Sequence, residues 1–117
     1  MGDLFEMNVS QKEIVLLPYP FSDLKQEKVR PALIVSNDVF NKKCADCIMV
    51  PLTSVIKDEP YSVLVNQDDM HSGRLVTQSR IKADKIFTVE KSLIIMKIGV
   101  IDDGAFRKVK VELLKIF

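Results

Sequence analysis

A short apolar run, entered through a proline and closed by polar residues, sets the narrowest limits on how this chain folds. It lies within residues 28–37 (KVRPALIVSN). Pro31 fixes its own φ angle and biases Arg30 toward extended backbone, so we expect Arg30 at the start of a β-strand rather than inside a helix. The four residues after the proline are apolar without alternation, which indicates a strand covered on both faces. Ser36 and Asn37 are each able to cap a short helix that follows.

Length and composition indicate a single small domain. The chain has 117 residues, of which 47% are hydrophobic, so its core is modest and benefits from oligomerisation. We expect residues 1–10 to form an N-terminal extension and residues 11–117 to form the domain. Seventeen Lys and Arg against sixteen Asp and Glu leave a net charge of +1, so a nucleic-acid partner has to meet a local basic patch. No apolar run is long enough to span a membrane and the N-terminus has no signal-peptide core, so we expect a cytoplasmic protein without a membrane partner.

The rest of the pattern predicts a chain of strands closed by one helix. Runs of β-forming residues bounded by prolines, glycines and charged turns predict strands at residues 13–19, 30–35, 46–53, 61–66, 75–81, 84–89 and 93–98. Residues 21–29 and 67–74 are polar or turn-like, and we expect them to be loops. Asp102 and Asp103 form a helix-capping signal. The apolar residues that then recur at helical spacing are Phe106, Val109, Leu113 and Ile116. The sequence therefore predicts an amphipathic helix packed on a β body.

Cys44 and Cys47 form a Cys-x-x-Cys pair, which invites a zinc or a redox interpretation. Zinc takes about four ligands, and the rest of the chain offers only His71 and carboxylates. A redox pair begins a helix in a βαβ unit, whereas this pair runs directly into an apolar strand. We therefore interpret the cysteines as ordinary thiols at a strand entrance and His71 as a solvated loop residue. We expect no metal and no cofactor.

Five short strings occur along the chain after residue 9. They read IVL (14–16), PF (20–21), RPALIVSN (30–37), VPLTS (50–54) and ADKIFTVEK (83–91). In this order and spacing they resemble the MazF/PemK family of toxin-antitoxin endoribonucleases, also called mRNA interferases. The resemblance covers nearly the whole chain.

The resemblance implies an SH3-like barrel of the CcdB/MazF type, mainly β with short helices and a C-terminal α-helix. It also implies a growth-arresting toxin of a type II toxin-antitoxin system, a homodimer that cleaves single-stranded RNA (mRNA) in a groove at the dimer interface without a metal ion. A cognate antitoxin would occupy that groove with an extended C-terminal segment, and operator DNA would be contacted only through the antitoxin.

By position, the family's active-site arginine falls on Arg30, its active-site threonine or serine on Thr53, and its acidic residue at the start of the first strand on Glu13. The family usually has glycine just before that acidic residue, where a close backbone approach is expected. This chain departs from the pattern with Lys12.

RNA cleavage makes demands that can be matched to residues of this chain. Attack by the 2′-hydroxyl needs a base, a positive group for the pentavalent phosphate and an acid for the departing 5′-oxygen. A pair of histidines within one subunit is excluded, because His71 is alone. Arg30 can neutralise the phosphorane and donate to the leaving oxygen, while the Thr53 hydroxyl orients the phosphate. Glu13 or Glu27 is a candidate base. Taken singly, Arg30 also fits a surface ion pair, Thr53 a strand end bonded to its own backbone, and Glu13 a solvated strand end.

Further contacts with RNA are expected from cationic and aromatic side chains near the loops. By loop position these are Lys25, Lys28, Lys57, Arg74, Arg80 and Lys82, with Tyr19, Phe21 and Tyr61 as stacking surfaces. Two other functions on the same barrel stay open, namely a CcdB-like toxin that binds gyrase and a noncatalytic binding module. The Arg30 and Thr53 pair favours the nuclease, since a gyrase binder has no need of it.

Overall fold

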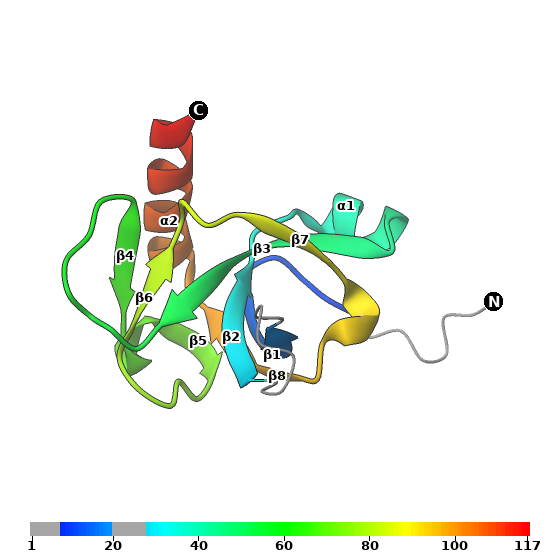
Figure 1. The fold of residues 1–117 in the computed structure, drawn as a ribbon, viewed down its shortest axis with the longest axis horizontal. Helices are drawn as coiled ribbons and strands as arrows, with labels where there is room; N and C mark the ends of the chain where they lie inside the picture. Colours follow the sequence, from blue (N-terminus) through cyan, green and yellow to red (C-terminus); the bar gives the residue numbers. More distant parts are fainter. Residues whose placement is uncertain (1–7, 20–27) are drawn as a thin grey trace.

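The computed structural model of the chain describes residues 8–19 and 28–117. Strands in these residues are β1 (Glu13–Tyr19), β2 (Lys28–Ile34), β3 (Asp46–Thr53), β4 (Ser62–Val65), β5 (Met70–Gly73), β6 (Ser79–Lys82), β7 (Phe87–Glu90) and β8 (Met96–Ile101). The helices are α1 (Asp38–Lys43), α2 (Asp103–Ile116) and the short 3-10 turns η2 (Gln67–Asp69) and η3 (Lys91–Leu93). Figure 1 shows a strongly curled sheet, with α2 and α1 at opposite ends of the view.

The strands form an antiparallel sheet in the order β4-β6-β3-β2-β1-β8-β5, and β7 pairs with β3 beside this path. β3 is the branch point, because β2 pairs along one of its edges while β7 and then β6 pair along the other. The sheet therefore curls into a half-barrel (Figure 1). The ladder between β2 and β3 stops where Ala32 faces Pro51, and beyond this point the two strands part.

Alternate residues of the central strands pack on opposite faces of the sheet. Leu33 and Val50 belong to a buried cluster that α2 covers with Phe106. Ile34 and Met49, their neighbours in sequence, belong to a second buried cluster on the other face. Both faces of β2 are therefore covered, which confirms the prediction made from its unbroken apolar run.

Both α-helices begin at capping residues that the sequence predicts. Asn37 accepts a hydrogen bond from the backbone N–H of Phe40 at 2.8 Å, and Asp102 accepts one from the backbone N–H of Ala105 at 2.7 Å. Each side chain satisfies an N–H that the first helical turn leaves without a partner. Of the two candidate caps for α1, Asn37 is used, whereas Ser36 is buried.

Two sequence-based assignments are wrong in part, because residues 67–74 contain strand β5 and the predicted strand at residues 75–81 begins only at Ser79. β5 has no apolar alternation to reveal it. Its backbone instead lies so close to β8 that a Cβ on Gly73 would stand 2.3 Å from the carbonyl oxygen of Ile98. Gly73 also has a φ angle of +81°, which favours glycine.

The described part of the N-terminus contributes to the fold. Val9, which the sequence assigns to an extension, is buried in the second cluster. The backbone N–H of Ser10 donates to Glu13 Oε1 at 2.7 Å. Most of the predicted loop at residues 21–29 lies outside the described residues, and its last two residues are the first two of β2. Within the described ranges, no helix has the length and apolar character needed to cross a membrane.

Candidate functional site

Arg30 and Thr53 lie at the ends of neighbouring strands on the same face of the sheet. The ladder pairs Ala32 with Pro51, and residues two apart on a strand point to the same side. Arg30 and Thr53 each lie two residues beyond this pair, on the same side of their strands, where the ladder between β2 and β3 has ended. On its other side Thr53 pairs with Arg80 of β6. The threonine thus lies between two strands that each carry an arginine.

The Thr53 hydroxyl is held by the turn that follows β3. Its Oγ1 accepts a hydrogen bond from the backbone N–H of Val55 at 3.1 Å. This is the local backbone bond typical of a threonine at a strand end. A hydroxyl has one donor and two acceptor positions, so this bond leaves the Thr53 proton able to reach an anionic oxygen.

Arg80 is directed toward the loop between β3 and β4. Its Nε donates to the Ile56 carbonyl oxygen at 3.1 Å, and its Nη1 donates to Ser62 Oγ at 3.1 Å. Its Nη2 lies 3.5 Å from Asp58 Oδ1, and the side chain is only 12% exposed. The sequence-based expectation that Arg80 contacts RNA therefore competes with contacts inside the protein.

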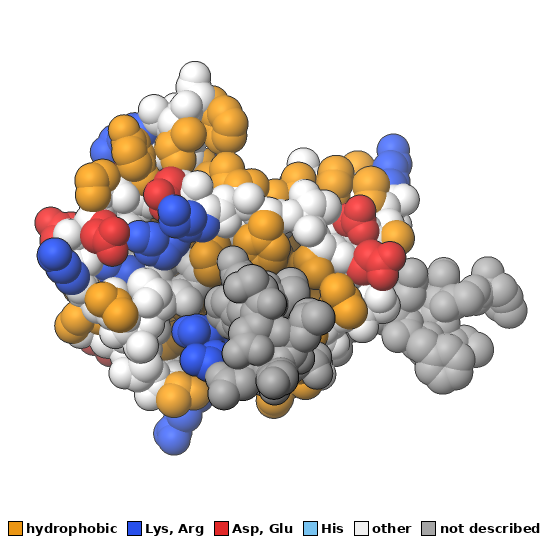
Figure 2. Space-filling view, in the orientation of Figure 1, with side chains coloured by type: hydrophobic (Ala, Val, Ile, Leu, Met, Phe, Trp, Pro, Cys, Tyr) orange, Lys and Arg blue, Asp and Glu red, His pale blue; other side chains and the backbone are white. Residues whose placement is uncertain are grey.

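A second ion pair connects the same loop to β6. Lys82 Nζ lies 3.0 Å from Glu59 Oε2, and its hydrogen bond and charge hold the pKa of Glu59 below its usual value. Lys57, in the same loop, is exposed. Figure 2 shows Lys and Arg side chains next to Asp and Glu side chains over β4 and β6, so this face carries both signs of charge.

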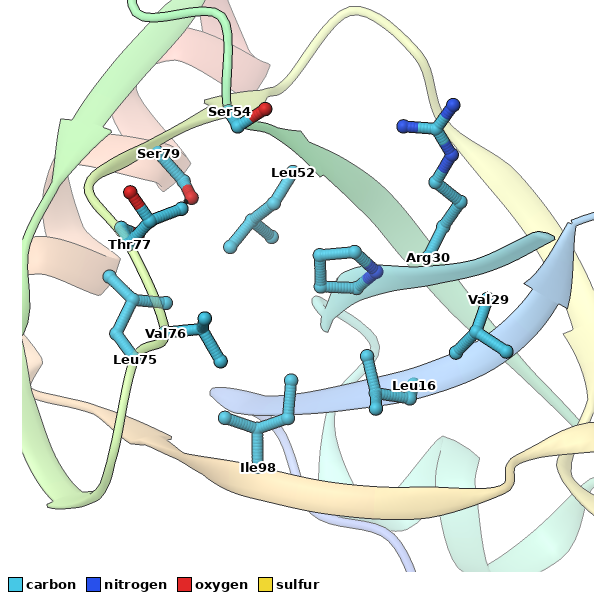
Figure 3. A pocket seen from close by; sticks show the side chains of 11 residues that line it. Leu16, Val29, Arg30, Leu52, Ser54, Leu75, Val76, Thr77, Ser79 and Ile98 are labelled. Carbon is cyan, nitrogen blue, oxygen red and sulfur yellow. Dashed lines mark hydrogen bonds between the residues drawn. The ribbon is translucent and has the colours of Figure 1, made fainter.

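A pocket of about 230 Å³ opens beside Arg30, between β2, β3 and residues 75–79. Figure 3 shows apolar side chains that include Leu52, Leu16 and Ile98, while the Arg30 guanidinium points away from them. The hydroxyl-bearing residues in the wall are Ser54, Thr77 and Ser79. The pocket thus combines an apolar wall with a few hydroxyl groups next to a cation.

Ser54 and Thr77, which line this wall, were not predicted as site residues from the sequence. Ser54 directly follows Thr53, so the second hydroxyl at the exit of a buried strand was an available signal. Thr77 offers no such signal, because residues 75–78 read as a strand and approach β2 and β3 only through the fold.

Glu13 lies apart from Arg30 and Thr53. It opens β1, whereas Arg30 pairs with Leu17 near the other end of that strand, so roughly 13 Å of strand separates the two positions. Glu13 is nearly buried, and its Oε2 lies 3.1 Å from Lys97 Nζ on β8. Within one chain, Arg30 and Thr53 lie just beyond the same end of the β2–β3 ladder, whereas Glu13 lies at the far end of β1.

The other expected RNA-contacting residues fall into three groups. Lys28 is exposed and pairs with Tyr19 at the end of the sheet where Arg30 lies. Further along the chain, the exposed ones are Lys57, Tyr61 and Arg74. Outside the described residues lie Phe21 and Lys25, together with the candidate base Glu27.

The two cysteines and the histidine are not among the residues that line the pocket beside Arg30. Cys44 ends α1 and Cys47 is buried on β3, and both are free thiols, as expected at a strand entrance. Burial raises the pKa of the Cys47 thiol to about 11, while the charge of Lys91 lowers it and that of Asp46 raises it. His71 is exposed, on β5 rather than in a loop. Among the residues that the structure describes, no group of three or more His, Cys, Asp or Glu side chains is arranged to hold a metal ion.

These features define a class of protein, a small β half-barrel with a C-terminal helix and a cationic site where two strands part. The family described as the PemK-like, MazF-like toxin of type II toxin-antitoxin systems matches residues 10–117. The chain therefore belongs to this toxin family. No curated protein matches it.

Solved structures share the fold at low sequence identity. An endoribonuclease from a mycobacterial species has a TM-score of 0.74 and 24% identity, over 95% of this chain and 92% of that one. An endoribonuclease in complex with its cognate antitoxin, also mycobacterial, has a TM-score of 0.73 and 24% identity, over 92% of both chains. MazE–MazF from Deinococcus radiodurans has a TM-score of 0.77 and 18% identity, over 94% of this chain and 96% of that one. The expected mainly β, SH3-like barrel with a C-terminal helix is confirmed.

Proposed function

We propose that this toxin is an endoribonuclease that cleaves single-stranded RNA through attack of a 2′-hydroxyl, without a metal ion, at a site containing Arg30 and Thr53. The observation that supports the proposal is the strand register, in which Arg30 and Thr53 each lie two residues beyond the Ala32–Pro51 pair, on the same side of β2 and β3. The reaction class is supported by the two mycobacterial proteins of the same fold that are described as endoribonucleases.

In this reaction the 2′-hydroxyl gives its proton to a base and forms a bond to phosphorus, the bond from phosphorus to the 5′-oxygen breaks, and the 5′-oxygen takes up one proton as it leaves. The products are a 2′,3′-cyclic phosphate and a 5′-hydroxyl end. Arg30 binds the phosphate and neutralises the charge that develops on the phosphorane, because a guanidinium stays charged and offers a fork of N–H donors. It also donates a hydrogen bond to the departing 5′-oxygen. The Thr53 hydroxyl, which accepts from Val55, donates its proton to a phosphate oxygen.

The base that takes the 2′-hydroxyl proton must lie within hydrogen-bond reach of it. Glu13 of the same chain lies too far from Arg30 to meet this condition. We therefore keep Arg30 and Thr53 as the proposed catalytic residues, and we assign to Glu13 the ion pair with Lys97 that joins β1 to β8.

The RNA strand runs along the end of the sheet that carries Arg30 and Lys28. Proteins that bind single-stranded RNA receive unstacked bases against apolar or aromatic side chains and hydrogen-bond the base edges. The pocket beside Arg30 has such a wall, with Ser54 and Thr77 as hydroxyl groups. We therefore place an unstacked base there in the proposed complex.

The toxin acts as a homodimer and is inhibited by a cognate antitoxin. Two relatives of the same fold are complexes of this kind, one with its cognate antitoxin and one described as MazE–MazF. A second copy is supported by exposed apolar side chains along α2, where Val111 is 48%, Leu114 71% and Phe117 87% exposed. Figure 2 shows hydrophobic side chains gathered over this helix.

Incubating the purified protein with total RNA in EDTA, and mapping the new ends, tests the proposed reaction. We expect cuts at discrete positions that carry 5′-hydroxyl and 2′,3′-cyclic phosphate ends. Cuts that leave 5′-phosphates, or cuts that appear only when Mg²⁺ replaces EDTA, would contradict the proposed mechanism. A chain with both Arg30 and Thr53 replaced by alanine is the matched control for contaminating nuclease.

A further inference from the structure

Two nitrogen atoms of the Arg80 guanidinium reach the loop formed by residues 54–61, Nε at the Ile56 carbonyl oxygen and Nη2 at the Asp58 carboxylate. The third, Nη1, donates to Ser62 Oγ at the start of β4, directly after the loop. A guanidinium presents its donors in a rigid planar fork, so these contacts hold the loop and its junction with β4 against β6. The loop is therefore held against β6 by a side chain that solvent barely reaches.

Arg80 contacts the residue that directly follows the turn that orients the Thr53 hydroxyl. Val55 donates its N–H to Thr53 Oγ1, and Ile56, the next residue, gives its carbonyl oxygen to Arg80. Thr53 and Arg80 are also paired across β3 and β6. A continuous chain of contacts therefore runs from the Thr53 hydroxyl through Val55 and Ile56 to the Arg80 side chain, and the strand pairing returns it to Thr53.

The charge around Arg80 disfavours a direct contact with RNA. Asp58 already stands beside the guanidinium, so a phosphate would have to displace a carboxylate of the same sign of charge. The second link of the loop joins Lys82 to Glu59, three residues further along the chain from Ile56.

We propose that Arg80 is a positioning residue for the RNA cleavage, and that it acts by holding the turn that orients the Thr53 hydroxyl. The inference rests on the proposed function and replaces the sequence-based expectation that Arg80 contacts RNA. A displacement of about 1 Å at a reacting group costs on the order of 10²-fold in rate. Loss of the Arg80 side chain therefore lowers the rate of the chemical step rather than the affinity for RNA.

Single-turnover cleavage of an RNA oligonucleotide by Arg80→Ala, Arg80→Lys and Asp58→Asn tests this role. We expect Arg80→Ala to lower the rate at saturating RNA by about 10- to 100-fold, with an apparent KM close to that of the wild type. Arg80→Lys should restore little, because an ammonium keeps the charge but loses the fork. Asp58→Asn should lower the rate in the same direction, and the double variant should be no worse than Arg80→Ala, since both act on the same loop.

Lys85→Ala is the control, because it removes an exposed positive charge near Glu59 of the same loop. Hydrogen exchange of the amides of residues 54–61 should speed up in Arg80→Ala and stay unchanged in Lys85→Ala. Melting temperatures show whether each variant is folded.

A direct RNA contact by Arg80 predicts the opposite pattern and would overturn the inference. Arg80→Ala would raise KM and reduce the slope of log affinity against log salt by about 0.7, Arg80→Lys would retain part of the binding, and Asp58→Asn would improve it. Cleavage at the wild-type rate by folded Arg80→Ala would overturn the inference about Arg80 and leave the proposed function standing. Failure of the wild type to cleave any RNA would overturn the proposed function together with this inference.

Discussion

At the scale of single residues, Lys12 holds a backbone conformation that favours glycine. Its φ angle is 81°, in the left-handed region, where a Cβ costs about 1–2 kcal/mol. The positive φ angle is a physical reason for the glycine that the resemblance leads one to expect at this position, and it means that Lys12 carries a backbone cost. Lys12 is also tied down by contacts, as its N–H donates to the Ile34 carbonyl oxygen at 2.9 Å and its Nζ lies 2.5 Å from Asp103 Oδ1.

Comparing Lys12→Gly with Lys12→Ala isolates the backbone strain, because both variants lose the ammonium group. We expect the glycine variant to be the more stable by about 0.5–1 kcal/mol, which is the relief of strain less the greater freedom of glycine in the unfolded chain. Urea denaturation of the two variants measures the difference. An alanine variant as stable as the glycine variant would show that position 12 is not strained.

The Cys47 thiol is expected to be unreactive in the folded protein. Burial raises its pKa from 9.0 to about 11, so the folded state keeps it protonated at pH 8. Because the folded pKa is the higher one, its contribution to stability is present below pH 9 and is lost as the pH rises through 11. A thiol reagent at pH 8 should modify Cys44 quickly and Cys47 only on unfolding, and Cys44→Ser should remove the fast phase. Two fast phases in the folded wild type would contradict the buried position of Cys47.

At the scale of elements, the sequence predicts those strands that local signals bound on both sides. β1 and β3 are found to the residue, because prolines and charged residues enclose their apolar runs. β8 begins later than predicted, since residues 91–93 form η3. β5 cannot be read locally, because its place depends on the close approach of its backbone to β8.

In the candidate site, too, some positions follow from local sequence signals and others depend on the fold. The sequence predicts Arg30 and Thr53 as polar residues near the ends of buried strands, and the pairing of β2 with β3 puts them beyond the same end of one ladder. The contacts of Arg80 cannot be read in this way. They arise because residues 54–61 fold back over β6, which no local pattern specifies.

α1 has six residues and is too short to be stable alone, so its side-chain bonds to the sheet decide its position. Asn41 exchanges hydrogen bonds with Ser36 at 2.5 and 2.9 Å, and Lys91 Nζ donates to the Asn41 carbonyl oxygen at 2.6 Å. We expect Asn41→Ala to lower the free energy of unfolding by about 2–3 kcal/mol, since two buried hydrogen bonds to Ser36 are lost and Ser36 Oγ keeps only its contacts with the backbone of Ile48.

Asn37→Ala is the matched control in the same helix, because it removes only a cap on the exposed side and should cost about 1 kcal/mol. Chemical denaturation of both variants gives the comparison. An Asn41→Ala loss no larger than that of Asn37→Ala would show that the buried bonds do not hold α1 in place.

At the scale of the whole molecule, we expect a homodimer at micromolar concentration. A chain of 117 residues buries a limited core, and the apolar side chains along the outer part of α2 gain from being covered by a second copy. Light scattering over a range of roughly 1–100 µM, where dimers of micromolar or tighter affinity form, should give twice the chain mass. A monomer mass throughout that range would contradict the expectation.

The role of Arg30 is central to the proposed function. A preorganised charged donor contributes about 3–4 kcal/mol to a transition state, or roughly 10²–10³ in rate. Replacement by lysine keeps the charge but loses the fork that spans two phosphate oxygens, so Arg30→Lys should be nearly as damaging as Arg30→Ala. Thr53→Ala should cost less and Thr53→Ser least, because serine keeps the hydroxyl. Lys42→Ala is the control, since it removes an exposed cation on α1, outside the proposed site.

The most direct test is the single-turnover rate of RNA cleavage by Arg30→Ala in EDTA, measured beside its melting temperature. We predict a rate lower by at least roughly 10²-fold with little change in melting temperature, and loss of growth arrest when the variant is expressed. A folded Arg30→Ala protein that cuts RNA at the wild-type rate would contradict the assignment of this site. Growth arrest that persists in a variant unable to cut RNA would contradict the nuclease itself as the source of toxicity.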